Sequence, residues 1–240
     1  LHGKVTTGMS HFLFRPFMTK YTRLDRKTRH AADMYINVLE QLGVTDVANH
    51  GLHIETSKEW NDEVFHFYKS QGVMPRDKII GFNIGSAVPE KRWPAERFAD
   101  VADYFGNKGY KTVFFGGPMD LDMVKPVVEQ MKTSPIVATG AFKLGPLAAA
   151  MKWCDLLITN DSGPMHVAIS QGVPIVALYG PSNPFFYGPY QAKSIVLESM
   201  DHYEIGKSMK QVIKEGKYKG ISVITEEQVI KAAETLLQES

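Results

Sequence analysis

Short apolar runs alternate with amphipathic stretches along most of the chain after residue 78. The apolar runs predict buried strands at residues 79–85, 111–117, 136–139, 155–159, 174–180 and 194–198. The stretches between and after them predict helices at residues 94–109, 120–132, 145–152, 164–171 and 225–238. Wholly apolar strands that alternate with helices are typical of βαβ units. The pattern therefore predicts an α/β fold, with a parallel sheet covered by helices on both faces.

The first third of the chain has a weaker pattern. Residues 1–30 show no sustained period, whereas residues 31–42 and 57–70 have the spacing of amphipathic helices. Ser57 is placed to cap the second of these helices. The apolar faces that we expect consist of Met34, Val38, Leu39 and Leu42 in the first helix, and of Val64, Phe65 and Tyr68 in the second.

Composition narrows the class of protein. The 240 residues include one cysteine, Cys154, which excludes an internal disulfide and any zinc site built on several cysteines. No apolar run approaches the roughly 18 residues of a membrane span. No histidine spacing is typical of a metal site, so we expect no metal. A single cysteine suits the reducing environment of the cytoplasm.

Charge is unevenly distributed. The net charge is +1, yet residues 1–30 carry seven Lys or Arg residues and a single acid, Asp25. Aromatic residues are interspersed among these cations, which favours contact with an anionic membrane surface or another polyanion. A solvated basic segment is an equally good interpretation, and both stay open. We predict no nucleic-acid partner.

Three clusters of polar residues and glycine follow predicted strands, where open α/β sheets bind ligands. The first, "GSAVPEKRWP" at residues 85–94, offers the Ser86 hydroxyl and the Lys91 ammonium close to a helix start. These groups suit a phosphate or diphosphate. A solvated loop is the alternative. The second, "FFGGPMD" at residues 114–120, places Asp120 where a carboxylate could accept hydrogen bonds from ribose, or could cap the next helix.

The third cluster, "NDSGPMH", spans residues 160–166. Asp161 or Ser162 is expected to cap a helix that begins near Gly163, where a ligand could reach the backbone. His166 lies on the first turn and could donate a hydrogen bond to a phosphate. A half-buried histidine without a ligand is the alternative. Asp161 would repel a phosphate, so it is expected to cap the helix or to accept hydrogen bonds from sugar hydroxyls. The aromatic loop at residues 179–189 could line a pocket or form a packed turn.

Motifs of several nucleotide-binding and hydrolytic enzymes are absent. The sequence contains no G-x-x-x-x-G-K-[ST], and no G-x-G-x-x-G follows its first βα strand. It has no G-x-S-x-G nucleophile elbow either. Instead, "GSAVPEKRWPAERFADVADYF", "VFFGGPMD" and "NDSGPMHVAISQGVPIVALYGPSNP" together resemble the C-terminal half of glycosyltransferase family nine, the ADP-heptose:lipopolysaccharide heptosyltransferases and their relatives. The resemblance covers about residues 30–240.

The resemblance implies a GT-B fold, in which two Rossmann-like domains face each other. Residues 1–50 would be the tail of an N-terminal acceptor domain and the crossover, and residues 51–240 a Rossmann-like donor-binding domain with a C-terminal helix. By resemblance, the donor would be bound by Ser86, Lys91, Asp120, Asp161, Ser162, Gly163 and His166.

The resemblance also implies an inverting transfer of heptose or a similar sugar, with ADP-heptose as donor and a lipid-linked saccharide of the lipopolysaccharide type as acceptor. In the family a carboxylate in the N-terminal domain acts as base. Cationic side chains and helix N-termini stabilise the leaving diphosphate, so the resemblance implies no tightly bound cofactor. The first half of the N-terminal domain, which carries the base, has no counterpart here, so the catalytic residue is not assigned. A chain that begins at Leu1 is expected to be a fragment or a processed product. "HYEIGKSMKQVIKEGKYKGIS" at residues 202–222 stands where many relatives carry a cysteine-rich stretch.

Two other functions stay open from the residues alone. A sugar-nucleotide epimerase uses a similar fold, but it would need acid and base residues that the sequence does not indicate. A non-catalytic nucleotide-binding module is the alternative from a different class. For the leading interpretation we expect a cytoplasmic protein that works at the inner membrane.

Overall fold

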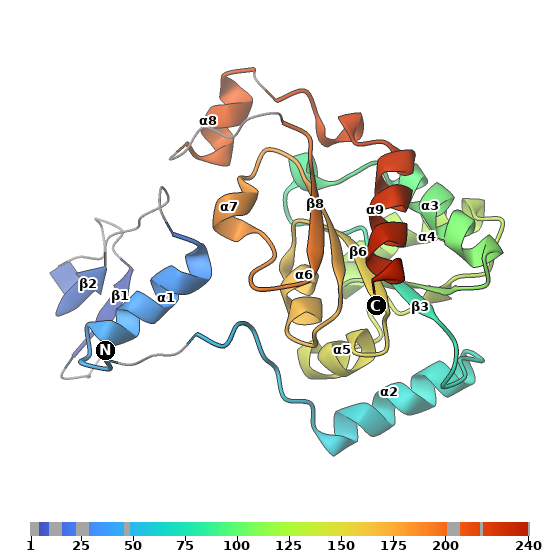
Figure 1. Cartoon of the computed structure of the whole chain (residues 1–240), viewed down its shortest axis with the longest axis horizontal. Coiled ribbons are helices and arrows are strands. Elements are labelled where there is room, and N and C mark those ends of the chain that lie inside the picture. The colour runs from blue at the N-terminus through green and yellow to red at the C-terminus, as the bar shows by residue number, and fades with distance from the viewer. Residues whose placement is uncertain are drawn as a thin grey trace.

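The computed structural model describes residues 5–9, 16–22, 29–45, 49–200, 207–216 and 218–239. Its main body is a six-stranded parallel sheet with helices on both faces (Figure 1). The order across the sheet is β5–β4–β3–β6–β7–β8. The strands are β3 (Ile79–Asn83), β4 (Lys111–Phe115), β5 (Ile136–Val137), β6 (Leu156–Asn160), β7 (Ile175–Tyr179) and β8 (Ser194–Glu198). The predicted α/β fold is confirmed.

Two apolar clusters, one on each face of the sheet, form the core. The first involves α2 (Lys58–Ser70), α5 (Leu144–Met151) and α6 (Gly163–Ile169). The second involves α3 (Ala95–Asn107), α4 (Leu121–Gln130) and α9 (Glu226–Gln238). In α3 the buried residues Phe98, Val101, Ala102 and Phe105 follow the i, i+3, i+4, i+7 spacing of one helical face.

Capping explains where two predicted helices begin. Ser57 accepts a hydrogen bond from the Trp60 amide at 3.3 Å, as the sequence indicates for the start of α2. Thr225 and Gln228 form a reciprocal capping box at the start of α9. These side chains satisfy backbone amides that a helix leaves without an internal partner.

The predicted apolar faces of the first two helices are only partly right. Met34 in α1 (Ala31–Glu40) is buried, but Leu39 and Leu42 are exposed. In α2 the residue Val64 is buried against α5, whereas Phe65 is 43% exposed. Successive residues lie about 100° apart around a helix, so a helix that packs along one narrow stripe leaves the next residue in solvent.

The N-terminal part contains two strands that the sequence pattern did not predict. Strands β1 (Thr7–Met9) and β2 (Lys20–Thr22) pair in parallel, and α1 packs on them. Three-residue strands are too short to give a recognisable period. Most cations of residues 1–30 lie outside the described residues, and so does the larger part of the predicted contact with an anionic surface. The domain boundary near residue 50 stays a prediction.

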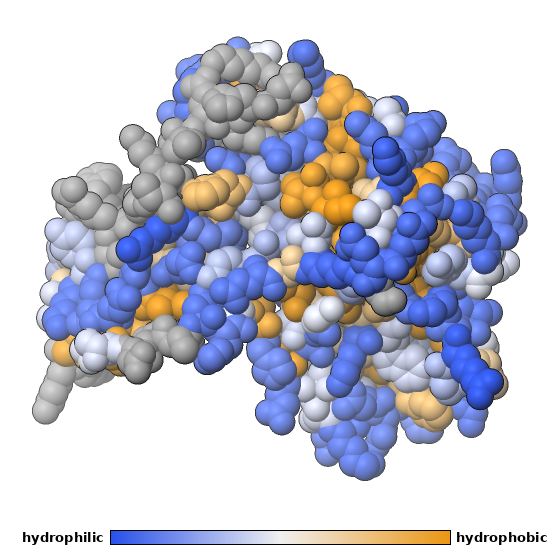
Figure 2. All heavy atoms as spheres, in the orientation of Figure 1, coloured by the Kyte–Doolittle hydropathy of each residue, from blue (hydrophilic) through white to orange (hydrophobic). Residues whose placement is uncertain are grey.

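The remaining elements are short. They are η2 (Pro89–Lys91), η3 (Pro118–Asp120), α7 (Pro184–Tyr187), α8 (Met209–Lys214) and η4 (Ile221–Val223). Figure 2 shows a mostly hydrophilic face, with apolar atoms gathered over the edge strand β8 and along the segment toward η4. Among the described residues, no helix is both long and apolar enough to cross a membrane.

The strand order locates the crevice where a ligand would bind. From β3 the chain adds β4 and β5 on one side and then returns to place β6, β7 and β8 on the other. In open α/β sheets ligands bind outside the carboxyl ends of the strands at such a switch point, here between β3 and β6. The first and third polar clusters of the sequence follow these two strands directly.

Candidate functional site at the carboxyl edge of the sheet

The loop that follows β3 is held at both ends by one buried side chain. Asn160, the last residue of β6, donates a hydrogen bond to the carbonyl of Ile84 at 2.8 Å. The Oδ1 atom of the same side chain accepts from the Trp93 amide at 3.1 Å. Asn160 is fully buried, so an exchange for solvent partners is unfavourable. This clamp fixes the ends of the loop at residues 84–93, which carries Ser86 and Lys91.

Lys91 forms an ion pair with Asp161 across the switch point. Its Nζ atom lies 2.5 Å from Oδ2 of Asp161, and the two side chains are 17% and 6% exposed. The hydroxyl of Ser182, which is 4% exposed, donates to the same carboxylate oxygen at 2.5 Å. A pair this little exposed is screened far less than a surface ion pair. Lys91, Asp161 and Ser182, which are far apart in the sequence, thus meet in one group.

Of the two residues that the sequence predicts as a cap for α6, Asp161 does not cap the helix. The other role expected for Asp161, accepting hydrogen bonds from sugar hydroxyls, stays a prediction. Ser162 occupies the N-cap position, but its side chain makes no capping hydrogen bond. Instead, its hydroxyl accepts from Asn83 Nδ2 at 2.7 Å. The local preference of Asp for helix starts is outweighed here because a charged partner, Lys91, reaches the carboxylate from another loop.

The other predicted residues of the first and third clusters lie close by. Ser86 is buried, and its hydroxyl donates to the Asp161 carbonyl at 3.4 Å. Gly163 is exposed at the start of α6, and a Cβ atom there would meet no atom within 4 Å. The space beside this backbone is therefore open to a ligand.

Asp120 lies on the other side of β3. Its carboxylate accepts a hydrogen bond from the Gly117 amide at 2.8 Å and makes no capping bond to α4. A Cβ atom on Gly85 would stand 2.4 Å from Oδ1 of Asp120. Glycine at position 85 thus permits the carboxylate to approach the backbone of the Ser86 loop. The predicted cap of the next helix is therefore absent, because the Asp120 carboxylate stabilises the turn that precedes α4 instead. The predicted contact with ribose stays a prediction.

His166 lines a cavity with several aromatic residues in its walls, called here the aromatic cavity. Burial lowers the pKa of His166; Asp161 raises it, and His30 and Lys91 lower it further. The imidazole is therefore neutral at neutral pH. The cavity has a volume of about 460 Å³. Its walls come from α1, α6 and the segments around them, and they include His30, Tyr35, Leu52, Tyr187 and Tyr190.

Polar contacts join α1 to the rim of this cavity. The His30 ring stacks on Tyr190 with centroids 4.6 Å apart. Its Nδ1 atom accepts from the Ala32 amide, so Nε2 donates to the Gly188 carbonyl, at 3.1 Å. Burial lowers the pKa of His30, despite the opposite effects of Gly188 and Asp33, which favours this neutral form.

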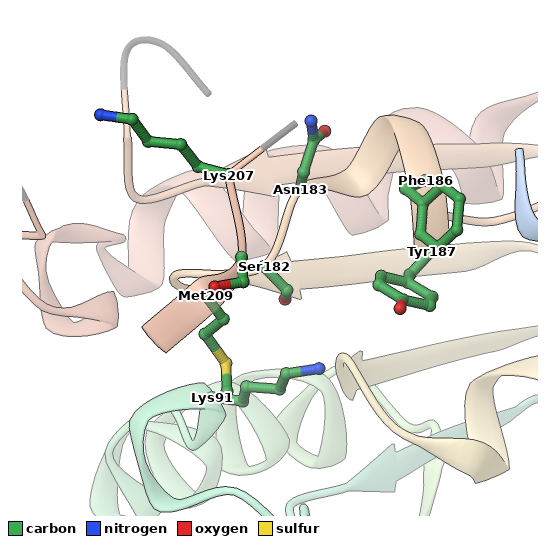
Figure 3. Close-up of a pocket in the computed structure, with 8 residues that line it drawn as sticks. Lys91, Ser182, Asn183, Phe186, Tyr187, Lys207 and Met209 are labelled. Carbon is green, nitrogen blue, oxygen red and sulfur yellow. The ribbon is translucent and has the colours of Figure 1, made fainter. Parts of the chain in front are cut away.

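Lys91 also borders a smaller cavity of about 220 Å³. Its walls consist of Lys91, Ser182, Asn183, Phe186, Tyr187, Lys207, Ser208 and Met209. Figure 3 shows Met209 extending from the start of α8 toward Lys91, whereas Lys207 extends away from it. Tyr187 borders both this cavity and the aromatic one, so the two lie next to each other.

Sequence reasoning missed several members of the site. Ser182 belongs to "GPSNP", in the loop that the sequence predicts as a pocket wall or a packed turn without a role for this serine. Asn83 is the polar last residue of an otherwise apolar strand, and the sequence pattern gave no reason to single it out. Its Oδ1 atom is buried without a hydrogen-bond partner in the structure. No local signal pointed to the start of α8. Among the described residues, no group of three or more His, Cys, Asp or Glu is placed to hold a metal ion.

A family model described as glycosyltransferase family 9 (heptosyltransferase) matches residues 3–219. The chain belongs to this family. The resemblance stated from the three motifs is thereby confirmed. The match extends across the whole carboxyl edge of the sheet, including the loops that carry Lys91, Asp120 and Asp161.

Curated relatives match a large part of this chain. It is 32% identical over 166 residues to lipopolysaccharide heptosyltransferase 2 of Salmonella typhimurium, covering 67% of this chain and 47% of the relative. Identity to lipopolysaccharide heptosyltransferase 2 of Escherichia coli is 32% over 164 residues, covering 66% and 47%. The chain spans about half the length of the curated relatives it matches.

Solved structures confirm the fold. The crystal structure of the glycosyl transferase family 9 from Veillonella parvula superimposes with a TM-score of 0.91 and 79% identity, covering 100% of this chain and 69% of that one. The ADP-heptose lipopolysaccharide heptosyltransferase II of Escherichia coli gives a TM-score of 0.78 at 24% identity, covering 98% and 70%. At that identity the second likeness shows the fold alone.

Proposed function

We propose that the chain binds the nucleotide-diphosphate-sugar donor of an inverting heptosyltransferase, with ADP-heptose as donor and a lipopolysaccharide-type saccharide as acceptor. The observation that carries this proposal is Lys91, a cation paired with Asp161 at the switch point between β3 and β6. Membership of glycosyltransferase family 9 and relatives named for heptosyl transfer support the same function. Because such an acceptor is lipid-linked, we further propose that the enzyme works at a membrane surface.

In this proposal Lys91 and His166 bind the diphosphate. The ammonium supplies a charge-assisted hydrogen bond, and the imidazole supplies an N–H donor. Asp161 would hold Lys91 in place, which removes the difficulty of a carboxylate beside a phosphate. Ser86, Ser162 and the open backbone at Gly163 would supply polar contacts around the same group.

The two ends of the donor would extend in opposite directions from the diphosphate. Asp120, at the tip of β4 and close to the Gly85 backbone, would accept hydrogen bonds from the ribose hydroxyls. The aromatic cavity beyond His166 is placed for the sugar, because aromatic rings accept the apolar face of a pyranose. The proposed ligand thus lies along the carboxyl edge from β4 to α6.

The proposed reaction is a direct displacement at the anomeric carbon. The acceptor oxygen forms a bond to that carbon on one side while the bond to the diphosphate oxygen breaks on the other. The hydroxyl proton passes to a base, a role that we assign to no described residue. Lys91 and His166 would stabilise the charge that develops on the leaving diphosphate, which is the larger part of what this portion contributes to the rate.

Titration of ADP into the chain at several pH values tests this proposal. We expect saturable binding whose affinity rises as the pH falls through the pKa of His166 in the complex, because burial lowers the pKa of His166 in the free protein and a bound diphosphate raises it. The complex then takes up a proton that the free protein lacks. The titratable groups that face His166 are Asp161, His30 and Lys91.

His166→Gln separates this effect from the titration of ADP itself. The variant keeps a polar side chain but cannot be protonated, so we expect an affinity about 3- to 10-fold weaker and a smaller dependence on pH. Isothermal titration in buffers of different ionisation enthalpy measures the proton uptake directly. Equal affinity and equal proton uptake in the wild type and the variant would contradict the role of His166.

A further inference from the structure

The middle of the Lys91 loop is held from outside by a residue that no motif indicated. Tyr218 donates a hydrogen bond from its hydroxyl to the carbonyl of Glu90 at 2.6 Å. Glu90 immediately precedes Lys91 in η2. The clamp by Asn160 reaches only the two ends of this loop, at Ile84 and Trp93. Tyr218 therefore restrains the part of the loop from which the Lys91 side chain starts.

The backbone of a third loop packs directly against this hydrogen bond. A Cβ atom on Gly180 would stand 2.8 Å from the Glu90 carbonyl oxygen and 2.9 Å from the Tyr218 hydroxyl. Gly180 follows β7 and lies two residues before Ser182, which binds Asp161. The two partners of the Asp161 carboxylate are thus carried by loops that meet at the Tyr218–Glu90 contact.

Tyr218 belongs to the segment around α8, between β8 and η4. Farther back in the same segment, Lys207, Ser208 and Met209 line the cavity that Lys91 borders (Figure 3). Burial raises the pKa of Tyr218, so the phenol keeps its proton and remains a donor at neutral pH. The segment therefore lines one side of the cavity and also holds the Lys91 loop, which lines another side.

We propose that Tyr218 is a positioning residue, which fixes the Glu90 carbonyl and thereby sets where the Lys91 ammonium meets an anionic ligand. The inference rests on the proposed function, because it takes Lys91 as a diphosphate-binding group. Without the hydroxyl, η2 loses its restraint on that side. Lys91 then remains paired with Asp161 but is less well placed for a ligand.

Tyr218→Phe tests the proposal, because it removes one hydroxyl and keeps the ring. We expect the affinity for ADP, measured by isothermal titration of the 240-residue chain, to fall by about 3- to 10-fold. Tyr104→Phe is the matched control: it removes a hydroxyl that donates to Glu234 at 2.7 Å, on the α3–α9 face. Its ADP affinity should equal that of the wild type. Gly180→Ala, which presses on the same contact, should weaken ADP binding as well.

Combination with Lys91→Ala shows whether Tyr218 acts through Lys91. If it does, Tyr218→Phe causes no further loss of affinity in the Lys91→Ala background, whereas a merely structural role would give the same loss in both backgrounds. An unchanged affinity in Tyr218→Phe, together with a loss in Lys91→Ala, would overturn this inference and leave the donor site standing. An unchanged affinity in Lys91→Ala would overturn the donor site itself.

Discussion

Replacing Lys91 by alanine is expected to lower the affinity of the chain for ADP by about 10- to 100-fold. A hydrogen bond from a charged donor is worth about 1.5–3 kcal/mol, and the low exposure of Lys91 limits screening by solvent. The substitution also leaves the Asp161 carboxylate facing the site without its cation, which adds repulsion against a diphosphate. Isothermal titration measures the loss.

Lys78→Ala is the matched control for this substitution. Lys78 pairs with Asp155 at 2.9 Å, and Asp155 precedes β6 whereas Asp161 follows it. That pair lies at the amino end of β3 and β6, at the opposite edge of the same sheet. We therefore expect ADP binding to be unchanged in Lys78→Ala. A similar loss in both variants would show a general effect of charge and would contradict a specific role of Lys91.

Asp161→Ala is expected to lower the free energy of unfolding by about 3 kcal/mol. The carboxylate is the shared partner of Lys91 and Ser182, so its removal leaves a largely buried ammonium and a buried hydroxyl unpaired. Removal of one member of a buried pair costs more than the pair itself contributes, because the remaining charge cannot return to water. Urea denaturation of the variant and the wild type measures the difference.

Asp62→Ala provides the comparison for an exposed ion pair. Asp62 pairs with Lys58 one turn away on the surface of α2. We expect a change of less than about 0.5 kcal/mol there. A loss below about 1 kcal/mol in Asp161→Ala would contradict the view that Asp161 organises the site. ADP affinity should also fall in Asp161→Ala, since Lys91 is then no longer held at the crevice.

The sequence predicted those features that depend on local patterns. The parallel sheet followed from wholly apolar strands, and the start of α2 at Ser57 followed from a local capping preference. Placement of Lys91, Asp161 and His166 at one edge followed from the rule that parallel strands end together. Local patterns could not indicate that α2 packs along a stripe that leaves Phe65 exposed, because that depends on the shape of α5.

Contacts between distant loops lay beyond the reach of sequence reasoning. Of the two roles predicted for Asp161, the cap of α6 is absent, and the contact with sugar hydroxyls stays a prediction. The ion pair of Asp161 could not be predicted, because its partner Lys91 lies 70 residues earlier in the sequence. Ser182 and Tyr218 are ordinary loop residues in the sequence. They matter because the fold brings Ser182 to Asp161 and Tyr218 to Glu90. Only the folded arrangement brings these side chains to the same crevice.

The most direct test of the account is a crystal structure of the chain with ADP. The account predicts that the diphosphate lies at the switch point, with phosphate oxygens about 3 Å from Lys91 Nζ and an imidazole nitrogen of His166. The ribose should lie toward Asp120. ADP bound elsewhere on the molecule, or at this edge without contact to Lys91, would contradict the central claim.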